Sequence, residues 1–322
     1  MRVLLTGAFG NVGENTLAHL LQEGYDVTCF DLRTPRTEKL RVKLSRLGSF
    51  ETRWGDIRNA RDVNEAVKGV DCIIHLAAII PPLSERMPDL ARDVNVGGTR
   101  NLIKAAERLD PPPKFIFTSS IAVHGPRMSR PPPCRVDEPL NPTDNYSHHK
   151  VRCELELKES GLPWTILRLG GVLSLTIPRE LDPYMFEVPL DQRVELVHAW
   201  DVGLACKNAI TADTVGKTLF VGGGKSCQLI QREYFSAMLD AIGIGMLPDS
   251  AFRTPKDDSD WFYLDWMDTR ESQKLLKFQT HTFDDYLEEF KRVLGYKRYL
   301  TRLMRPIIRR NLLSKSPYYK KS

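Results

Sequence analysis

Near the N-terminus the chain reads Val3-Leu4-Leu5-Thr6-Gly7-Ala8-Phe9-Gly10-Asn11-Val12-Gly13. Three glycines, each three residues apart, stand between an apolar run and the start of a helical pattern. In such a turn Gly7 bends the chain tightly, Gly10 lets backbone N–H groups approach a pyrophosphate, and Gly13 lets the helix pack on the strand. We therefore expect a dinucleotide-binding turn of the Rossmann type. The alternative is an ordinary glycine-rich turn between a strand and a helix.

The first half of the chain alternates short apolar runs with helical patterns, which is typical of a parallel sheet covered by helices. The predicted strands are 2–6, 26–30, 72–76, 114–118 and 165–169, and the predicted helices are 15–23, 94–109 and 146–159. Right-handed crossovers of this kind build a doubly wound α/β fold.

The later residues predict a division into parts. We expect a Rossmann domain at residues 1–170, to which residues 195–225 return through a helix at 201–210 and a strand at 218–221. Residues 171–194 are rich in proline and read as an irregular excursion. Together with residues 226–290 they are expected to form a small C-terminal substrate lobe, and residues 291–322 a basic tail.

Composition restricts the class of protein. A chain of 322 residues with 42% hydrophobic and 27% charged residues is globular in composition. The six cysteines have no paired spacing and are too sparse for a disulfide framework, which favours a reducing compartment. The glycine-rich turn begins too early to leave room for a signal peptide, and no apolar run approaches the roughly 20 residues of a membrane span. We expect a cytoplasmic protein.

The net charge of +5 is unevenly distributed. Residues 291–322 carry eleven Lys and Arg and no acid, so the remaining chain has 35 bases against 41 acids. The body is therefore acidic, and we expect no nucleic acid partner.

The basic tail has an amphipathic pattern. Its apolar residues recur at helical spacing with arginines distributed around them: Leu300, Leu303, Met304, Ile307, Ile308 and Leu312, with Arg302, Arg305, Arg309 and Arg310. Such a helix binds anionic membrane surfaces, or it docks on the body or on a second subunit. Both alternatives stay open, and Pro306 predicts a kink or a restart of the helix.

Two carboxylates follow predicted strands on the dinucleotide side. Asp31 ends the second strand about 20 residues after the turn, where it can accept from ribose hydroxyls and repel a 2′-phosphate. NAD is therefore favoured, although Arg33 could bind the 2′-phosphate of NADP. Asp56 could accept from the adenine amino group, or it could be the N-cap of a helix at 59–67.

A second group of residues indicates proton transfer. Tyr146 and Lys150 lie four residues apart at the start of a predicted helix, so their side chains share one face. A nearby cation lowers the pKa of a phenol, and Tyr146 would then act as general acid and base. Ser120 ends a predicted strand and can hold the substrate oxygen whose proton Tyr146 exchanges.

These residues resemble the extended short-chain dehydrogenase/reductases, the NAD-dependent epimerase/dehydratase family. The motifs extend over roughly residues 1–290. In chain order they are Thr6-Gly7-x-x-Gly10-x-x-Gly13, Asp31, Asp56-Ile57, His75-Leu76-Ala77-Ala78, Asn95-x-x-Gly98-Thr99, Thr118-Ser119-Ser120, Tyr146-x-x-x-Lys150, Leu167-Arg168 and Val197-His198-x-x-Asp201-Val202.

The resemblance implies roles for individual residues. Phe9, Gly10, Asn11 and Val12 would meet the pyrophosphate, Asp56 and Ile57 the adenine, and Leu76, Ala77 and Ala78 the far side of the cofactor. Asn95 would help to position the active site, and Lys150 would also hold the nicotinamide ribose. Hydride would pass between a substrate carbon and nicotinamide while Tyr146 moves the hydroxyl proton.

The chain departs from the family pattern at the substrate side. His124 replaces a tyrosine common after the serine, and it either takes a catalytic role or contributes shape and a hydrogen bond. The segment between Gly170 and Val197 contains only Arg179 and Arg193 as bases, so the usual diphosphate clamp is not evident. A smaller substrate, such as a sugar, sugar acid, aldehyde or ketone, is credible.

The leading hypothesis is an NAD(P)-dependent oxidoreductase or epimerase acting on a small molecule, as a homodimer and without a metal. A dehydratase needs an acid and base beside the serine, whereas Ile121 and Ala122 occupy those positions. The alternative is a non-catalytic dinucleotide sensor or scaffold, which would be expected to lack Tyr146 or Lys150.

Overall fold

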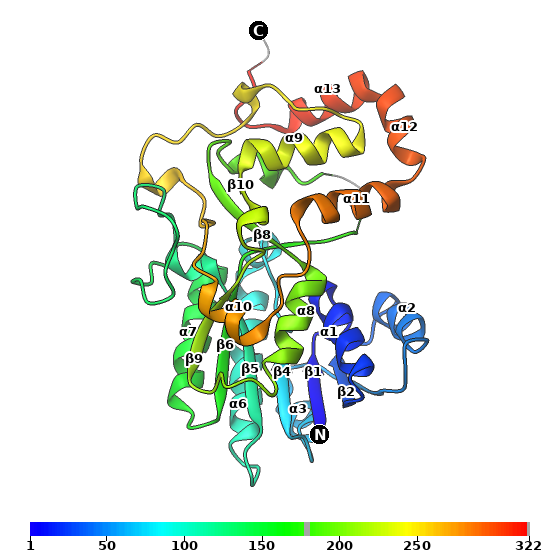
Figure 1. The fold of residues 1–322 in the computed structure, drawn as a ribbon, viewed down its shortest axis with the longest axis vertical. Helices are drawn as coiled ribbons and strands as arrows, with labels where there is room; N and C mark the ends of the chain where they lie inside the picture. Colours follow the sequence, from blue (N-terminus) through cyan, green and yellow to red (C-terminus); the bar gives the residue numbers. More distant parts are fainter. Residues whose placement is uncertain (177–180, 321–322) are drawn as a thin grey trace.

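The computed structural model describes residues 1–176 and 181–320. Figure 1 shows a parallel sheet with helices on both faces below a smaller, mainly helical lobe. The sheet has the strand order β3-β2-β1-β4-β5-β6-β9, and every pairing in it is parallel. Its strands are β1 (Arg2–Thr6), β2 (Asp26–Asp31), β3 (Glu51–Trp54), β4 (Cys72–His75), β5 (Lys114–Ser120), β6 (Trp164–Leu169) and β9 (Lys217–Val221). The predicted doubly wound α/β fold is confirmed.

Helices cover the two faces of this sheet. On one face α1 (Asn11–Gln22) packs against α8 (Ala199–Asn208), with Leu17, Leu20 and Val202 in the shared core. On the other face α3 (Ala60–Ala66), α6 (Thr99–Ala106) and α7 (Asn145–Glu159) bury a second core. Helices α2 (Pro35–Leu44), α4 (Leu83–Arg86) and α5 (Pro88–Arg92) lie in the connections.

The predicted helix 94–109 differs from the structure. The helix begins as a π-helix, η1 (Asp93–Gly98). It continues as α6, which ends at Ala106. Such wide turns are rare and occur frequently at functional sites, because they turn side chains away from the α-helical position.

The small lobe contains a three-stranded sheet of order β10-β8-β7, formed by β7 (Gly171–Leu173), β8 (Arg193–His198) and β10 (Gln228–Ile230). Residues 195–198 were expected to belong to the Rossmann domain, but they lie in β8, which pairs with β7 and β10. Within the expected segment 195–225, α8 and β9 return to the main sheet as predicted. The lobe's helices are α9 (Gln231–Ile242), α11 (Phe283–Leu294), α12 (Lys297–Leu303) and α13 (Arg305–Lys315).

Two further segments differ from the expected division. Helix α10 (Arg270–Leu276) packs against β9 and α8, so it belongs to the Rossmann side and not to the small lobe. The excursion after β7 contains a short 3-10 helix, η3 (Pro183–Glu187). Pro306 lies in the first turn of α13, where a new helix begins as expected.

The six cysteines are all free and buried. Burial raises the pKa of the Cys134 thiol to about 12 and that of the Cys227 thiol to about 11. Over residues 1–176 and 181–320, no helix has the length and apolar character needed to cross a membrane.

Candidate active site

The strand order places the predicted site at a topological switch point. The chain moves outward from β1 in both directions, so the carboxyl ends of β1 and β4 diverge and leave a crevice. Residues 7–13, which we call the glycine turn, follow β1, and Asp31 ends β2. Residues 76–78 follow β4, and Ser120 ends β5. The fold therefore brings these separate motifs to one edge of the sheet.

The glycine turn has the geometry of a close backbone approach. Gly7 has φ +66°, and a Cβ there would lie 2.8 Å from the backbone nitrogen of Ala77. A Cβ on Gly13 would overlap the carbonyl oxygen of Gly7. Gly10 is the N-cap of α1 and offers no side-chain cap, so the first N–H groups, including those of Asn11 and Val12, are not taken by a cap. This cradle fits the pyrophosphate of a dinucleotide.

Asp31 holds the glycine turn in place. Its Oδ2 accepts a 2.9 Å hydrogen bond from the N–H of Phe9, and its Oδ1 accepts one of 2.8 Å from Leu32. Burial raises the pKa of Asp31, partly offset by these backbone donors and by the charge of Arg36. Arg33 is exposed and forms a 2.7 Å ion pair with Glu38. Arg36, which the sequence did not single out, is therefore the arginine whose charge reaches Asp31.

The alternative role of Asp56 as a helix cap is wrong. Asn59 is the N-cap of α3, and its side chain accepts from the N–H of Arg61. Asp56 instead forms a 2.5 Å ion pair with Arg58, which lowers the pKa of its carboxyl group. Ile57 is buried directly beneath Gly98, where a Cβ would meet its side chain.

A buried hydrogen-bond network orients residues 76–78. The hydroxyl oxygen of Thr6 accepts from the N–H groups of Leu76 and Ala77 at 3.2 and 3.3 Å. It also lies 2.7 Å from Nδ1 of His75, whose Nε2 lies 2.8 Å from the hydroxyl of Thr99. Burial lowers the pKa of His75 to about 3, so the ring is neutral. This role of Thr6 in orienting residues 76–78 was not predicted from the sequence.

Asn95 acts on the loop that follows. Its Oδ1 accepts a 2.7 Å hydrogen bond from the N–H of Ile79, and its Nδ2 donates to the carbonyl of Ile79 at 2.8 Å. Asn95 lies inside the π-helix η1, which runs directly into α6. The residue that fixes the loop is therefore part of a continuous helix. The predicted positioning role has a geometric basis here.

The proton-transfer residues lie where β5 meets α7. Asp144 caps α7 by accepting from the N–H of Ser147 at 2.7 Å, which fixes the first turn that carries Tyr146. Lys150 lies four residues after Tyr146, and its buried Nζ donates a 2.7 Å hydrogen bond to the carbonyl oxygen of Thr118. Burial lowers the pKa of Lys150 to about 8.

Tyr146 lies between Ser120 and Lys150. The Nζ atom of Lys150 is 5.6 Å from the centroid of the Tyr146 ring. Burial raises the pKa of Tyr146, and Asp144 raises it further, whereas a hydrogen bond with the Ser120 side chain lowers it. The Ser120 hydroxyl also accepts from the N–H of Ala122 at 3.2 Å. The structure thus brings together the three residues predicted for proton transfer.

His124 is bound within the protein. Its buried ring has Nε2 at 2.9 Å from Nη1 of Arg168 and Nδ1 at 3.4 Å from the carbonyl oxygen of Pro139. Burial, followed by the charge of Arg168, lowers the pKa of His124 to about 4. Both ring nitrogens have partners, which favours the structural alternative over a substrate contact.

Arg193, one of the two arginines predicted to contact the substrate, is bound within the protein. Arg193 donates to both carboxylate oxygens of the buried Asp265, at 2.7 and 3.0 Å, and to the carbonyl of Arg130 at 3.0 Å. Asp265 also pairs with Arg127 at 2.5 Å. The guanidinium of Arg193 is therefore engaged in a buried ion cluster. Arg179 lies outside the described residues.

Two tyrosines near Tyr146 were not predicted from the sequence. Tyr184 in η3 and Tyr263 share a side-chain hydrogen bond; burial raises the pKa of both, and the charge of Asp144 adds to the increase. The phenol of Tyr146 also contributes to the raised pKa of Tyr263, so these two side chains interact electrostatically. The buried Gln192 fixes Tyr263 from both sides.

The amide of Gln192 makes two hydrogen bonds that flank Tyr263. Its Oε1 accepts from the N–H of Phe262 at 2.8 Å, and its Nε2 donates to the carbonyl of Leu264 at 2.6 Å. Because these residues are distant in sequence from Tyr146, no local pattern could have indicated them.

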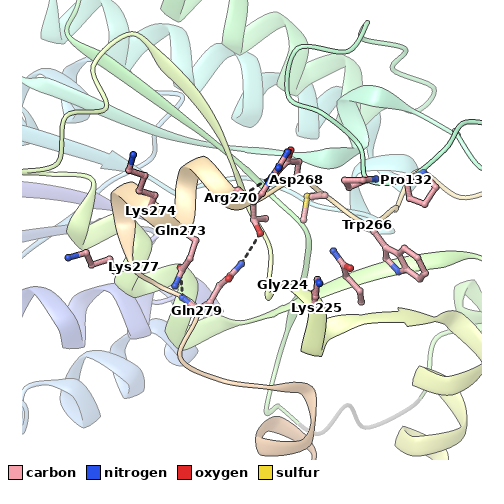
Figure 2. Close-up of a pocket in the computed structure, with 14 residues that line it drawn as sticks. Pro132, Gly224, Lys225, Trp266, Asp268, Arg270, Gln273, Lys274, Lys277 and Gln279 are labelled. Atoms are coloured by element: carbon pink, nitrogen blue, oxygen red, sulfur yellow. Dashed lines mark hydrogen bonds and ion pairs between the residues drawn. The ribbon is translucent and has the colours of Figure 1, made fainter.

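A second pocket, of about 870 Å³, lies between residues 132–133 and helix α10. Figure 2 shows Arg270 bound to Asp268, and both residues line the pocket. The side-chain amide of Gln279 donates to the hydroxyl of Thr269 at 2.9 Å. The residues that line it include none of those predicted for catalysis or for the cofactor. This pocket is separate from the site at the switch point.

The fold and the site together define a dinucleotide-binding protein of the Rossmann type. Comparison with family models matches residues 3–222 to the "NAD dependent epimerase/dehydratase family". The chain belongs to this family, as the motifs indicated, and the family is one of NAD-dependent enzymes.

Individual relatives are similar over shorter stretches. A 3-beta-hydroxysteroid dehydrogenase from Mycolicibacterium neoaurum is 39% identical over 127 residues, 38% of this chain and 32% of the relative. CDP-paratose 2-epimerase from Salmonella typhi is 35% identical over 130 residues, 39% of this chain and 38% of the relative. The alignments thus span less than two thirds of these relatives.

A solved structure is similar over nearly the whole fold. It is DesIV, a dTDP-glucose 4,6-dehydratase from Streptomyces venezuelae that was crystallised with NAD. It superposes with a TM-score of 0.77 at 23% identity, covering 93% of this chain and 98% of that chain. This likeness establishes the fold of the extended short-chain dehydrogenase/reductases.

Proposed function

We propose that this chain catalyses NAD-linked oxidation and reduction, or epimerisation, at a carbon that carries a hydroxyl or carbonyl group. The observation that carries the proposal is the grouping of Ser120, Tyr146 and Lys150 beside the glycine turn. A protein that only sensed the dinucleotide would have no need of a phenol, a hydroxyl and a buried ammonium in this arrangement.

The residues present fit NAD. When bound, NAD supplies a nicotinamide carbon that accepts or returns hydride and, in its oxidised form, a positive charge. The N–H groups of the glycine turn would hold the pyrophosphate, and Asp31 would accept from the ribose hydroxyls. Lys150 would hold the second ribose with its ammonium.

The proton would move through Tyr146. As the phenolate, Tyr146 would take the proton of the substrate hydroxyl during oxidation, and as the phenol it would return that proton during reduction. Ser120 would donate a hydrogen bond to the same substrate oxygen and keep it within reach of Tyr146. The raised pKa of Tyr146 would fall when positive charge is bound beside it.

We further infer a substrate without a diphosphate. Arg193, one of the two bases between Gly170 and Val197, is engaged by Asp265. Ile121 and Ala122 are fully buried, which leaves no acid and base beside Ser120 for a dehydration. Tyr184 and Tyr263 instead place aromatic rings and phenols near Tyr146. A sugar, sugar acid, aldehyde, ketone or cyclic alcohol suits these groups.

A substrate panel tests the proposal. The full chain is incubated with NAD or NADP and with sugars, sugar acids, hydroxysteroids, aldehydes and nucleotide sugars. Reduced nicotinamide is followed by absorbance and epimers by NMR. Turnover of a compound without a diphosphate is expected. Turnover of nucleotide sugars alone would contradict the substrate class, and NAD binding without turnover across the panel would favour the sensor.

The NAD preference, the cytoplasmic location and the homodimer stay predictions for this chain. Sedimentation equilibrium of the full chain measures the oligomeric state directly, and a monomer at micromolar concentration would contradict the dimer.

A further inference from the structure

The C-terminal helices α12 and α13 lie at the end of the molecule farthest from the parallel sheet (Figure 1). One side of α13 is docked on the small lobe. Leu312 is only 5% exposed and packs in a cluster with Phe186, Leu239 and Phe252. The side of α13 that carries Leu312 is therefore the side that contacts the small lobe.

Polar contacts fix this docking. The guanidinium of Arg309 donates to the carbonyl oxygens of Gly245 and Met246 at 3.0 and 2.5 Å. The hydroxyl of Ser316 donates to the carbonyl of Ala251 at 2.6 Å. Because these contacts lie on both sides of Leu312, α13 is held rigidly and presents a defined outer surface.

The outer surface is apolar to an unusual extent. Six of the seventeen exposed large apolar side chains among the described residues fall between residues 296 and 307. All six are more than half exposed, with Leu303 at 81% and Ile307 at 67%. We call them the docking face: Tyr296, Tyr299, Leu300, Leu303, Met304 and Ile307.

Tyr296, the N-cap of α12, forms one stripe with Tyr299, Leu300 and Leu303 of that helix, because positions 296, 299, 300 and 303 recur at helical spacing. Scattered apolar residues need no explanation, but a contiguous patch of this kind marks an interaction site.

Uncompensated positive charge surrounds the docking face. Within residues 291–322 there is no acid. Among residues 1–176 and 181–320, no ion pair joins Lys297, Arg302, Arg305 or Arg310 to an acidic side chain. These cations therefore remain available to an anionic partner that also accepts apolar side chains.

We propose that the docking face binds the surface of a bilayer that contains anionic phospholipids. Exposed leucine, isoleucine and methionine side chains would enter the acyl boundary, tyrosines would lie at the headgroup level, and the arginines would pair with phosphates. A symmetric dimer through the same face would place like charges against each other, so a second copy fits the charge less well. The body does not cover the face, because all six of its side chains are more than half exposed.

Vesicle flotation of the full chain tests this proposal. Vesicles of phosphatidylcholine alone are compared with vesicles that also contain phosphatidylserine. Wild-type protein is expected to float only with the anionic vesicles and to be released by salt, because the basic residues are screened. The variant Leu303→Ser/Ile307→Ser is expected to lose about tenfold or more in binding.

A matched variant controls for surface polarity. Leu47 and Val215 are exposed by 56% and 52% but lie in the Rossmann domain. Leu47→Ser/Val215→Ser should float like the wild type. Thermal unfolding and sedimentation are measured for all three proteins without lipid.

Three outcomes would overturn the proposal. The first is absence of binding to anionic vesicles by the wild type. The second is equal binding by both double variants. The third is a dimer that Leu303→Ser/Ile307→Ser converts to a monomer, which would assign the face to a second copy.

Discussion

The Nζ atom of Lys150 donates a 2.7 Å hydrogen bond to the backbone carbonyl oxygen of Thr118, two residues before Ser120. This contact joins the first turns of α7 to the carboxyl end of β5. Because Tyr146 precedes Lys150 by one helical turn, the same contact sets the distance between the phenol and the serine hydroxyl. The arrangement of the three proton-transfer residues thus depends on a buried ammonium.

Lys150→Met should remove this anchor and the charge that would hold the nicotinamide ribose. We expect turnover to fall by about a hundredfold or more. The unfolding midpoint should not fall, since replacing a buried charge by an apolar chain of similar length costs little. Steady-state rates and thermal unfolding measure the two effects. Lys104→Met, on the exposed side of α6, is the control and should change neither.

Asp31→Asn should change the choice of cofactor. The amide still accepts from the N–H of Phe9, but the negative charge that would repel a 2′-phosphate is gone. A charge-assisted hydrogen bond contributes about 1.5–3 kcal/mol, so NAD affinity should fall roughly ten- to a hundredfold while NADP gains. Titration calorimetry with both cofactors measures the ratio. An unaltered ratio would contradict the ribose assignment, and Asp26→Asn at the exposed start of β2 is the control.

Arg193→Gln should destabilise the fold rather than weaken substrate binding. The substitution removes the hydrogen bonds of Arg193 to the buried Asp265, which keeps Arg127 as its cation. A hydrogen bond to a charged group contributes about 1.5–3 kcal/mol, so we expect a loss of that size. Arg135→Gln removes an exposed pair with Asp137 and should cost less than about 1 kcal/mol. Urea unfolding compares the two variants. If Arg193→Gln raised the KM for the substrate and left the free energy of unfolding unchanged, Arg193 would instead be a substrate-binding residue.

His124 should contribute to loss of stability in mild acid. Its pKa is about 4 in the folded protein, whereas a free histidine titrates near 6.5. Between these values the unfolded chain binds a proton that the folded chain does not. Stability therefore falls as pH drops from about 6.5 to 4, by about 1.4 kcal/mol per pH unit for this group.

The variant His124→Asn isolates that contribution. Its free energy of unfolding should decline less steeply over this interval than that of the wild type. His148→Asn, at an exposed position on α7, should keep the wild-type slope. Identical slopes for all three proteins would show that His124 does not titrate as its burial requires.

Much of the Rossmann fold could be predicted because its signals are local. The strand predicted at 2–6 is β1, and the strand predicted at 165–169 begins one residue earlier, at Trp164. Buried parallel strands read as short apolar runs bounded by glycine and proline, so they need no knowledge of distant residues. The glycine turn and the spacing of Tyr146 and Lys150 are equally local.

The errors arose where distant residues decide the outcome. Residues 195–198 were assigned to the Rossmann domain, but they lie in β8 and join the small sheet, because β7 and β10 are their hydrogen-bonding partners. Arg193 and His124 have side chains suited to ligands, but Asp265 and Arg168 bind them from 72 and 44 residues away. Tyr184 and Tyr263 reach the site only through the folded lobe.

The most direct test of the central claim is the turnover of Tyr146→Phe with a substrate found in the panel, at saturating NAD. The variant retains the ring and loses only the hydroxyl. We predict that NAD affinity is unchanged and that turnover falls by at least about a hundredfold, because no other group replaces the proton donor and acceptor. Turnover equal to that of the wild type would contradict the mechanism.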